Sequence, residues 1–126
     1  ATGRPGPPSM TPTPPPVLPL HQQRCTHQSG PALSAPGQAA MLTQVKGWAV
    51  DASVPGGVLH QTFSFADYHP TMAFVNAVAW IAHEQDHHPD LMVSYNRCTI
   101  RWNTHSVGGL SINDFVCAAR VDQLYA

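Results

Sequence analysis

Hydrophobic side chains recur at helical spacing through one long stretch in the second half of the chain. The stretch contains two series of such positions, Phe74, Val78 and Ile81 and, beside them, Met72, Val75, Ala79 and Ala82. Residues three or four apart lie on one face of an α-helix, so the pattern predicts an amphipathic helix. Asp67 is its expected N-cap, and His87 is expected in its last turn, because the residue before Pro89 is pushed out of helical geometry.

Two shorter stretches predict further helices. Residues 33–45 offer Ser34 as a suitable N-cap, and Gly47 follows the expected end. Nearer the C-terminal end, Ser111 and Asp114 have the spacing of a capping box, in which two residues bond each other's backbone amides. The residues beside them form the apolar stripe of a buried helix face, Ile112, Phe115, Val116 and Ala119.

Four short segments predict β-strands, at residues 48–51, 58–65, 91–95 and 98–104. Alternation is clearest in the last, where Cys98, Ile100 and Trp102 point to one face. Short strands with amphipathic helices favour a layered fold. We therefore predict an α+β fold, a four-stranded antiparallel sheet with three helices packed on one face, in the order α-β-β-α-β-β-α.

The first 20 residues differ in composition from the rest. They hold eight of the 13 prolines, and Arg4 is their one charged side chain. Such a segment favours extended, solvated conformations and buries too little apolar surface to order itself. We predict a Pro-rich disordered leader at residues 1–20, with organellar targeting as the lesser alternative, and one folded domain at residues 21–126.

Bulk properties exclude several classes of function. A formal charge of −1 gives no basic surface for nucleic acid and no attraction to an anionic membrane. The longest apolar stretch is too short to cross a bilayer. The cysteines Cys25, Cys98 and Cys117 are far apart and form no C-x-x-C pair. An odd, scattered count indicates reduced thiols, so we expect a soluble, cytoplasmic protein.

Histidine is over-represented among the polar side chains, with eight copies against 13 acidic and basic side chains. His87 and His88 are adjacent, and His105 follows in a segment that ends at a Gly108-Gly109 turn. Imidazole both gives and takes protons near neutral pH and also ligates metals. Convergence of the three histidines would therefore form either an acid–base site or a metal site.

A zinc site is one of these alternatives. His83 to His87 spell H-E-x-x-H, the helical motif in which two histidines one turn apart bind zinc. The motif falls at the expected end of the helix, before Pro89, so a third ligand would have to come from elsewhere, such as His105. A zinc hydrolase is the less favoured interpretation.

A metal-free proton-transfer site is the other alternative. A histidine at a helix C-terminus, such as His87, is favoured as imidazolium by up to ~1 kcal/mol. His105, at the exit of a strand, suits a reactive side chain held by a rigid scaffold. A small substrate between them could give a proton to one and accept a proton from the other.

The histidine segment resembles the signature of a known family, the pterin-4a-carbinolamine dehydratases. The matching positions are His83, His87-His88-Pro89, Tyr95, His105 and Asp114, at the family's spacing. Histidine replaces the glutamate that relatives often have at position 83. The wider likeness runs from about His21 to the C-terminal end.

The resemblance implies an activity and a site. Members dehydrate the 4a-carbinolamine that aromatic amino-acid hydroxylases leave on their pterin, giving quinonoid dihydropterin. They need no metal or organic cofactor and assemble as homodimers or homotetramers. The catalytic histidines of the family correspond to His87, His88 and His105. A functional link to such a hydroxylase is implied, with no nucleic-acid or membrane partner.

The role of each candidate site residue is a hypothesis. We expect His87 and His105 to act as the acid–base pair, and His88 to position the pterin or share the proton. Four further residues are candidates for substrate binding, namely His83, Pro89, Asp114 and Trp102. Asp114 is favoured more as a helix cap, and Tyr95 and Trp102 more as core residues. A non-catalytic dimerisation or coactivator module of the same fold is the main alternative function.

Overall fold

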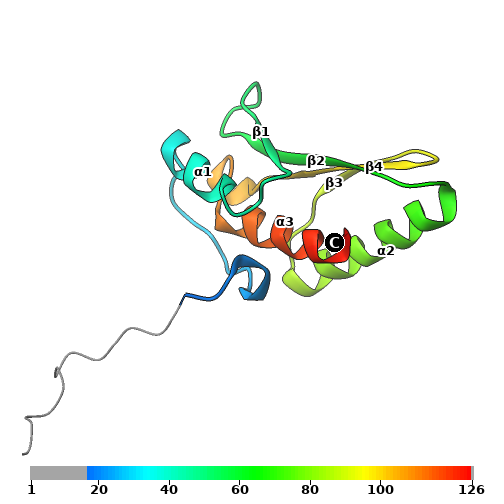
Figure 1. Cartoon of the computed structure of the whole chain (residues 1–126). Coiled ribbons are helices and arrows are strands. Elements are labelled where there is room, and N and C mark those ends of the chain that lie inside the picture. Colours follow the sequence, from blue (N-terminus) through cyan, green and yellow to red (C-terminus); the bar gives the residue numbers. More distant parts are fainter. Residues whose placement is uncertain (1–16, 126) are drawn as a thin grey trace, which may run out of the picture.

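The structure is a computed structural model that describes residues 17–125. Its sheet contains β1 (Ala49–Asp51), β2 (Val58–Ser64), β3 (Asp90–Val93) and β4 (Arg97–Trp102). The strands lie in the order β1-β2-β4-β3, and every neighbouring pair is antiparallel. The helices are α1 (Ala35–Leu42), α2 (Tyr68–Gln85) and α3 (Ile112–Tyr125), with short 3₁₀ turns η1 (Leu20–Gln22) and η2 (His105–Val107). The predicted α+β class and element order are confirmed (Figure 1).

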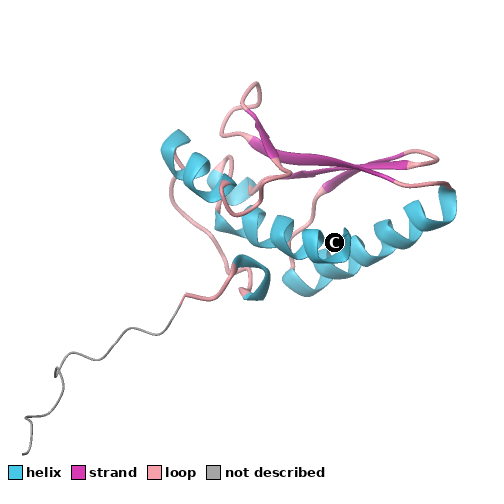
Figure 2. Cartoon of the chain, viewed as in Figure 1, coloured by secondary structure: helices cyan, strands magenta, loops and turns pink. Residues whose placement is uncertain are grey.

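The helices α2 and α3 cover one face of the sheet, and α1 lies near the N-terminal end of α3 (Figure 2). Alternate residues of the two central strands face these helices, among them Leu59, Phe63, Ile100 and Trp102, each at most 2% exposed. Burying such a side chain contributes about 1.5–3 kcal/mol. On the other face, the hydroxyls of Thr62 and Thr99 bond across the register at 2.8 Å. The alternation predicted for residues 98–104 is confirmed over Arg97–Trp102.

The end of α2 differs from the prediction. Asp86 takes a left-handed conformation (φ 49°, ψ 45°) directly after Gln85. The amide of Asp86 donates to the His83 carbonyl, and the amide of His87 donates to the Ala82 carbonyl, the paired bonds that close a helix. The helix therefore stops before Pro89 can affect it. The placement of His87 in the last helical turn was wrong, since His87 lies in the chain that leaves the helix.

Asp86 is the one non-glycine residue among residues 17–125 with a positive φ, which gives a testable consequence. A Cβ in this conformation costs roughly 1–2 kcal/mol, while glycine costs about 0.5–1 kcal/mol of extra chain entropy. We expect Asp86→Gly to raise the free energy of unfolding by about 0.5 kcal/mol in urea denaturation. Asp86→Ala keeps the Cβ and loses the short polar side chain that lets aspartate tolerate this conformation, so it should lower the free energy of unfolding. Equal destabilisation by both variants would contradict this prediction.

The predicted helix caps are confirmed in position and differ in chemistry. The Ser34 hydroxyl accepts from the amide of Gly37 at 3.2 Å, as an N-cap does. Asp67 occupies the N-cap of α2, but its side chain makes no capping bond. Instead, its carbonyl accepts from the Thr71 hydroxyl at 2.7 Å. The start of α2 is therefore stabilised through the backbone of Asp67.

The N-terminal part of the described chain packs against α3. Residues 1–16 of the predicted leader lie outside the described residues. Leu20, at the end of that segment, is 4% exposed and belongs to the core. Beyond η1, residues 23–28 form an extended segment, called the strap below. No helix within residues 17–125 has the length and apolarity that a membrane span requires.

Candidate active site

A buried carboxylate organises the site. Asp114, in the first turn of α3, is fully buried, and its Oδ1 lies 2.6 Å from His87 Nε2. Its Oδ2 accepts from the Thr104 hydroxyl at 2.8 Å and from the Ser111 amide at 2.9 Å. Three donors around one carboxyl group suit the ionised form, which only accepts hydrogen bonds. His87 Nε2 therefore carries a proton, and Nδ1 is the ring nitrogen left for another partner.

Hydroxyls extend this network. Because the Thr104 hydroxyl proton goes to Asp114, the Ser111 hydroxyl donates to Thr104 Oγ1 at 2.7 Å. Ser111 Oγ in turn accepts from the Asn113 amide at 3.2 Å. Asp114 thus caps α3 through the Ser111 amide, as the capping-box spacing predicted, and it also holds His87. The second role was not predicted from the sequence.

The charge of Asp114 changes the acid strength of His87. Burial alone would lower the pKa of His87, because it penalises the imidazolium. The hydrogen bond and the negative charge of Asp114 oppose burial, and the net effect raises the pKa of His87. A raised pKa keeps His87 protonated in a larger part of the neutral range, which suits a general acid.

The raised pKa of His87 predicts a pH dependence of stability. The folded state holds this proton more tightly than the unfolded chain, whose histidine pKa is about 6.5. Stabilisation is therefore fully present below about pH 6.5 and is lost as the pH rises through the raised value. Urea denaturation from roughly pH 5.5 to 8.5 should show the wild type losing stability relative to His87→Gln. A pH-independent difference between the two proteins would refute the assignment.

The ring of Trp102 packs against the His87 imidazole. The imidazole stacks on Trp102 with the ring centroids 5.5 Å apart and the planes 9° from parallel. Trp102 has no exposed surface, so it contacts His87 from the core and does not line a cavity. The interpretation of Trp102 as a core residue is confirmed. Tyr95, also expected in the core, is 63% exposed and stacks on Tyr68, because β3 ends before it.

The three histidines singled out by the sequence line one cavity of about 410 Å³, called the histidine cavity below. His87 and His88 come from the chain that leaves α2, and His105 comes from η2. Two backbone hydrogen bonds between Thr104 and Gly109 close the loop that carries η2. The complete lining is Asp86, His87, His88, Pro89, Asp90, Asn103, Thr104, His105 and Ser106.

His83 lies apart from this group. It remains on α2, where its ring lies beside Trp80 with the centroids 5.6 Å apart. His87 has left the helix and is bonded to Asp114, so the helical geometry of an H-E-x-x-H zinc motif is not formed. Within residues 17–125, no group of three or more histidine, cysteine or acidic side chains is arranged to hold a metal ion.

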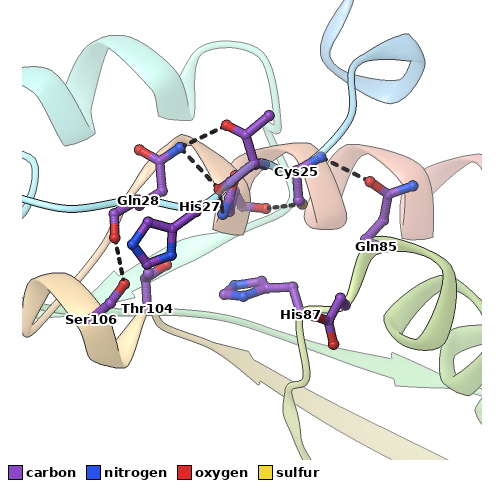
Figure 3. Close-up of a pocket in the computed structure, with 10 residues that line it drawn as sticks. Cys25, His27, Gln28, Gln85, His87, Thr104 and Ser106 are labelled. Atoms are coloured by element: carbon purple, nitrogen blue, oxygen red, sulfur yellow. Dashed lines mark hydrogen bonds between the residues drawn. The ribbon is translucent and has the colours of Figure 1, made fainter.

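A second cavity, of about 260 Å³, also has His87 in its lining and is called the strap cavity. Figure 3 shows the strap above His87, with Gln28 bonded to Ser106 at one end and Cys25 bonded to Gln85 at the other. The two cavities share Asp86, His87, Thr104 and Ser106. The other residues of its lining are Cys25, Thr26, His27, Gln28, Gln85 and Asn113.

Hydrogen bonds tie the strap to the elements that carry the site. The Cys25 amide donates to Gln85 Oε1 at 2.8 Å, next to the end of α2. Thr26 and Asn113 exchange two bonds, at 3.2 and 2.7 Å, which join the strap to α3. Ser106, in η2, donates to the Gln28 carbonyl at 2.8 Å. The strap was missed in the sequence because an extended segment with irregular pairing has no periodic signal.

Comparisons with known proteins agree on one family. The family profile described as "Pterin 4 alpha carbinolamine dehydratase" matches residues 31–124. A protein of Xanthomonas axonopodis pv. citri that carries the name pterin-4-alpha-carbinolamine dehydratase is 51% identical over 111 residues, covering 86% of this chain and 92% of its own. A protein of Stenotrophomonas maltophilia with the same name is 51% identical over 110 residues, covering 86% and 93%.

A solved structure supports the fold. The crystal structure of a transcriptional coactivator/pterin dehydratase from Brucella melitensis aligns with a TM-score of 0.71 and 24% sequence identity. The alignment covers 75% of this chain and 99% of that one. The arrangement of helices and sheet is therefore shared well beyond the residues that the two sequences have in common.

Proposed function

The chain belongs to the pterin-4a-carbinolamine dehydratase family, and from this membership we propose that it removes water from a pterin 4a-carbinolamine to give a quinonoid dihydropterin. One observation carries the proposal to particular residues. The histidine cavity is lined by three imidazoles, and one of them, His87, is bonded to a buried carboxylate. Such a pair is suited to proton transfer to a small, flat, polar molecule.

The reaction requires two proton transfers and no change of oxidation state. The bond between C4a and its hydroxyl oxygen breaks, and the oxygen leaves as water after it receives a proton. The proton on N5 is lost, and its bonding electrons form the C4a–N5 double bond. An acid near the hydroxyl and a base near N5 therefore accelerate the step, by roughly 10²–10⁴-fold for each well-placed group.

We assign the acid to His87 and the base to His105. Asp114 holds the Nε2 proton of His87, so Nδ1 is the atom that would protonate the leaving oxygen. The raised pKa of His87 supports a protonated ground state. His105, exposed on η2, would accept the N5 proton, and His88 would position the pterin. His83 and Trp102 do not line the cavity, so we assign them no contact with substrate.

A stopped-flow assay tests the function directly. Purified protein should accelerate the disappearance of a freshly generated pterin 4a-carbinolamine above its spontaneous rate, in proportion to enzyme concentration. A matched sample without protein gives the spontaneous rate. Dehydration at the spontaneous rate in the presence of folded protein would reject the proposal and would favour the non-catalytic dimerisation or coactivator module.

Further proposals come with family membership. We propose assembly into a homodimer or homotetramer, with residence in the cytoplasm and a functional link to an aromatic amino-acid hydroxylase. One structural feature supports self-association, because β3 lies at the edge of the sheet and pairs only with β4 among the described strands. Light scattering of the purified chain measures the assembly.

A further inference from the structure

Two of the cysteines form a close pair beside the strap cavity. Cys25 Sγ, in the strap, lies 3.5 Å from Cys117 Sγ, on α3, although 92 positions separate the two residues in sequence. Both are free thiols. A disulfide bond has sulfurs about 2.05 Å apart, so its formation would require an approach of roughly 1.5 Å. The strap is held by side-chain hydrogen bonds and not within a sheet, so a movement of this size is small for it.

The two thiols differ in access. Cys25 is half-buried and lines the strap cavity, whereas Cys117 is fully buried behind it. A small reagent that enters the cavity can therefore meet Cys25, whereas Cys117 has no exposed surface and contacts Cys25. This is the division of roles expected of a peroxide-reactive cysteine and its resolving partner.

The surroundings lower the pKa of Cys25, although as a thiol Cys25 also donates to the Asn113 carbonyl at 3.6 Å. The hydrogen bond from Cys117 is the largest effect on the pKa of Cys25 and lowers it, and the positive charge of His87 lowers it further. Burial and Asp114 act in the opposite direction, but the net pKa is lowered. The pKa of Cys117 is raised, chiefly by its bond to Cys25. A thiolate is the reactive form of cysteine.

We propose that Cys25 and Cys117 form a redox modification site, at which a hydroperoxide converts the two thiols into an intramolecular disulfide. Cys25 sulfur attacks one peroxide oxygen, the O–O bond breaks, and the other oxygen leaves as water or alcohol. Cys25 becomes a sulfenic acid. Cys117 sulfur then attacks Cys25 sulfur, the S–S bond forms, the S–O bond breaks, and the oxygen leaves as water with the Cys117 proton. The thiols lose two electrons, which reduce the peroxide.

The modification has a structural consequence. The disulfide would fasten the strap covalently to α3, where hydrogen bonds between Thr26 and Asn113 already hold it. It would close a long loop of the chain, which restricts the unfolded state. We therefore expect the oxidised protein to unfold at a higher urea concentration than the reduced protein. This inference does not depend on the dehydratase activity.

Mass spectrometry after peroxide treatment tests the site, with Cys98 as an internal control. Cys98 is fully buried, its pKa is raised by burial, and it has no cysteine partner among the described residues. Trypsin places the three cysteines on separate peptides, because Arg24, Lys46, Arg97, Arg101 and Arg120 divide the chain. Native reduced protein treated with hydrogen peroxide should yield a linked peptide pair containing Cys25 and Cys117. Cys98 should remain a free thiol, which is alkylated once the treated protein is unfolded.

Variants distinguish the steps. Cys117→Ser should stop at the sulfenic acid of Cys25, which dimedone traps, and Cys98→Ser should form the disulfide as the wild type does. In native protein, Cys25 should react at least about ten-fold faster than Cys98, and the difference should vanish in urea. Equal consumption of Cys25 and Cys98 in native protein, a linkage that involves Cys98, or a linkage between two chains would overturn the proposal. Circular dichroism checks that each variant is folded.

Discussion

Replacing His87 or His105 by alanine is expected to lower the rate of carbinolamine dehydration by at least about ten-fold, and replacing both should lower it further. The reason is the division of the reaction into protonation of the leaving oxygen and removal of the N5 proton. His87 and His105 line one cavity from different elements, so each can serve one of these steps. Stopped-flow kinetics at saturating substrate measures the chemical step for each variant.

His69 supplies a matched control for these variants. It is an exposed histidine at the opposite end of α2 from His87, and it lines neither of the two cavities. His69→Ala should therefore retain the wild-type rate. Wild-type turnover in both the His87 and His105 variants, with unchanged circular dichroism, would remove these residues from the mechanism. A raised KM with an unchanged kcat would instead assign the two histidines to substrate binding.

The pH profile separates the two histidines. The pKa of His87 is raised, so the activity that depends on its protonated form should persist to higher pH than an ordinary histidine allows. His87→Ala should remove this alkaline limb of the profile, whereas His105→Ala, which keeps His87, should lower the rate and retain the limb.

The sequence predicted the long helix well, and its end poorly. Periodicity locates α2 because the apolar stripe repeats over many turns, and its expected N-cap, Asp67, is in place. The end depends on the left-handed conformation of Asp86, which the nearby bonds to Ala82 and His83 stabilise. A glycine would have signalled such a turn, whereas an aspartate does not. From the sequence, the end of the helix was therefore attributed to Pro89, whereas Asp86 already ends it.

The sequence likewise predicted the residues of the candidate site but not the contacts between them. The spacing of His87, His88 and His105 was enough to single them out, and the structure brings them to one cavity. The bond between His87 and Asp114 could not be predicted, because the capping-box spacing already explained Asp114 within its own helix. Contacts between residues far apart in sequence depend on how α2 and α3 pack together. The pairing of Cys25 with Cys117 has the same origin.

Asp114 is the residue whose loss should affect both stability and rate. Asp114→Ala would remove the acceptor of three donors, the buried ones on Thr104 and Ser111 and the partly buried one on His87. Each unsatisfied buried donor costs about 1–3 kcal/mol, so the two on Thr104 and Ser111 predict a loss of roughly 2 kcal/mol or more in the free energy of unfolding. Because that variant can unfold under assay conditions, the decisive replacement is the isosteric Asp114→Asn.

Asp114→Asn keeps the shape of the side chain but removes its charge. We expect it to return the pKa of His87 toward or below the ordinary value, because burial then acts without opposition from Asp114. The dehydration rate should fall at least about ten-fold, and NMR titration of the His87 ring should report the lowered pKa. Asp122→Asn is the matched control. Asp122 also lies on α3, accepts a hydrogen bond from the Trp48 ring nitrogen and lines neither cavity. An Asp114→Asn protein with the wild-type rate and an unshifted His87 titration would show that the carboxylate only caps the helix.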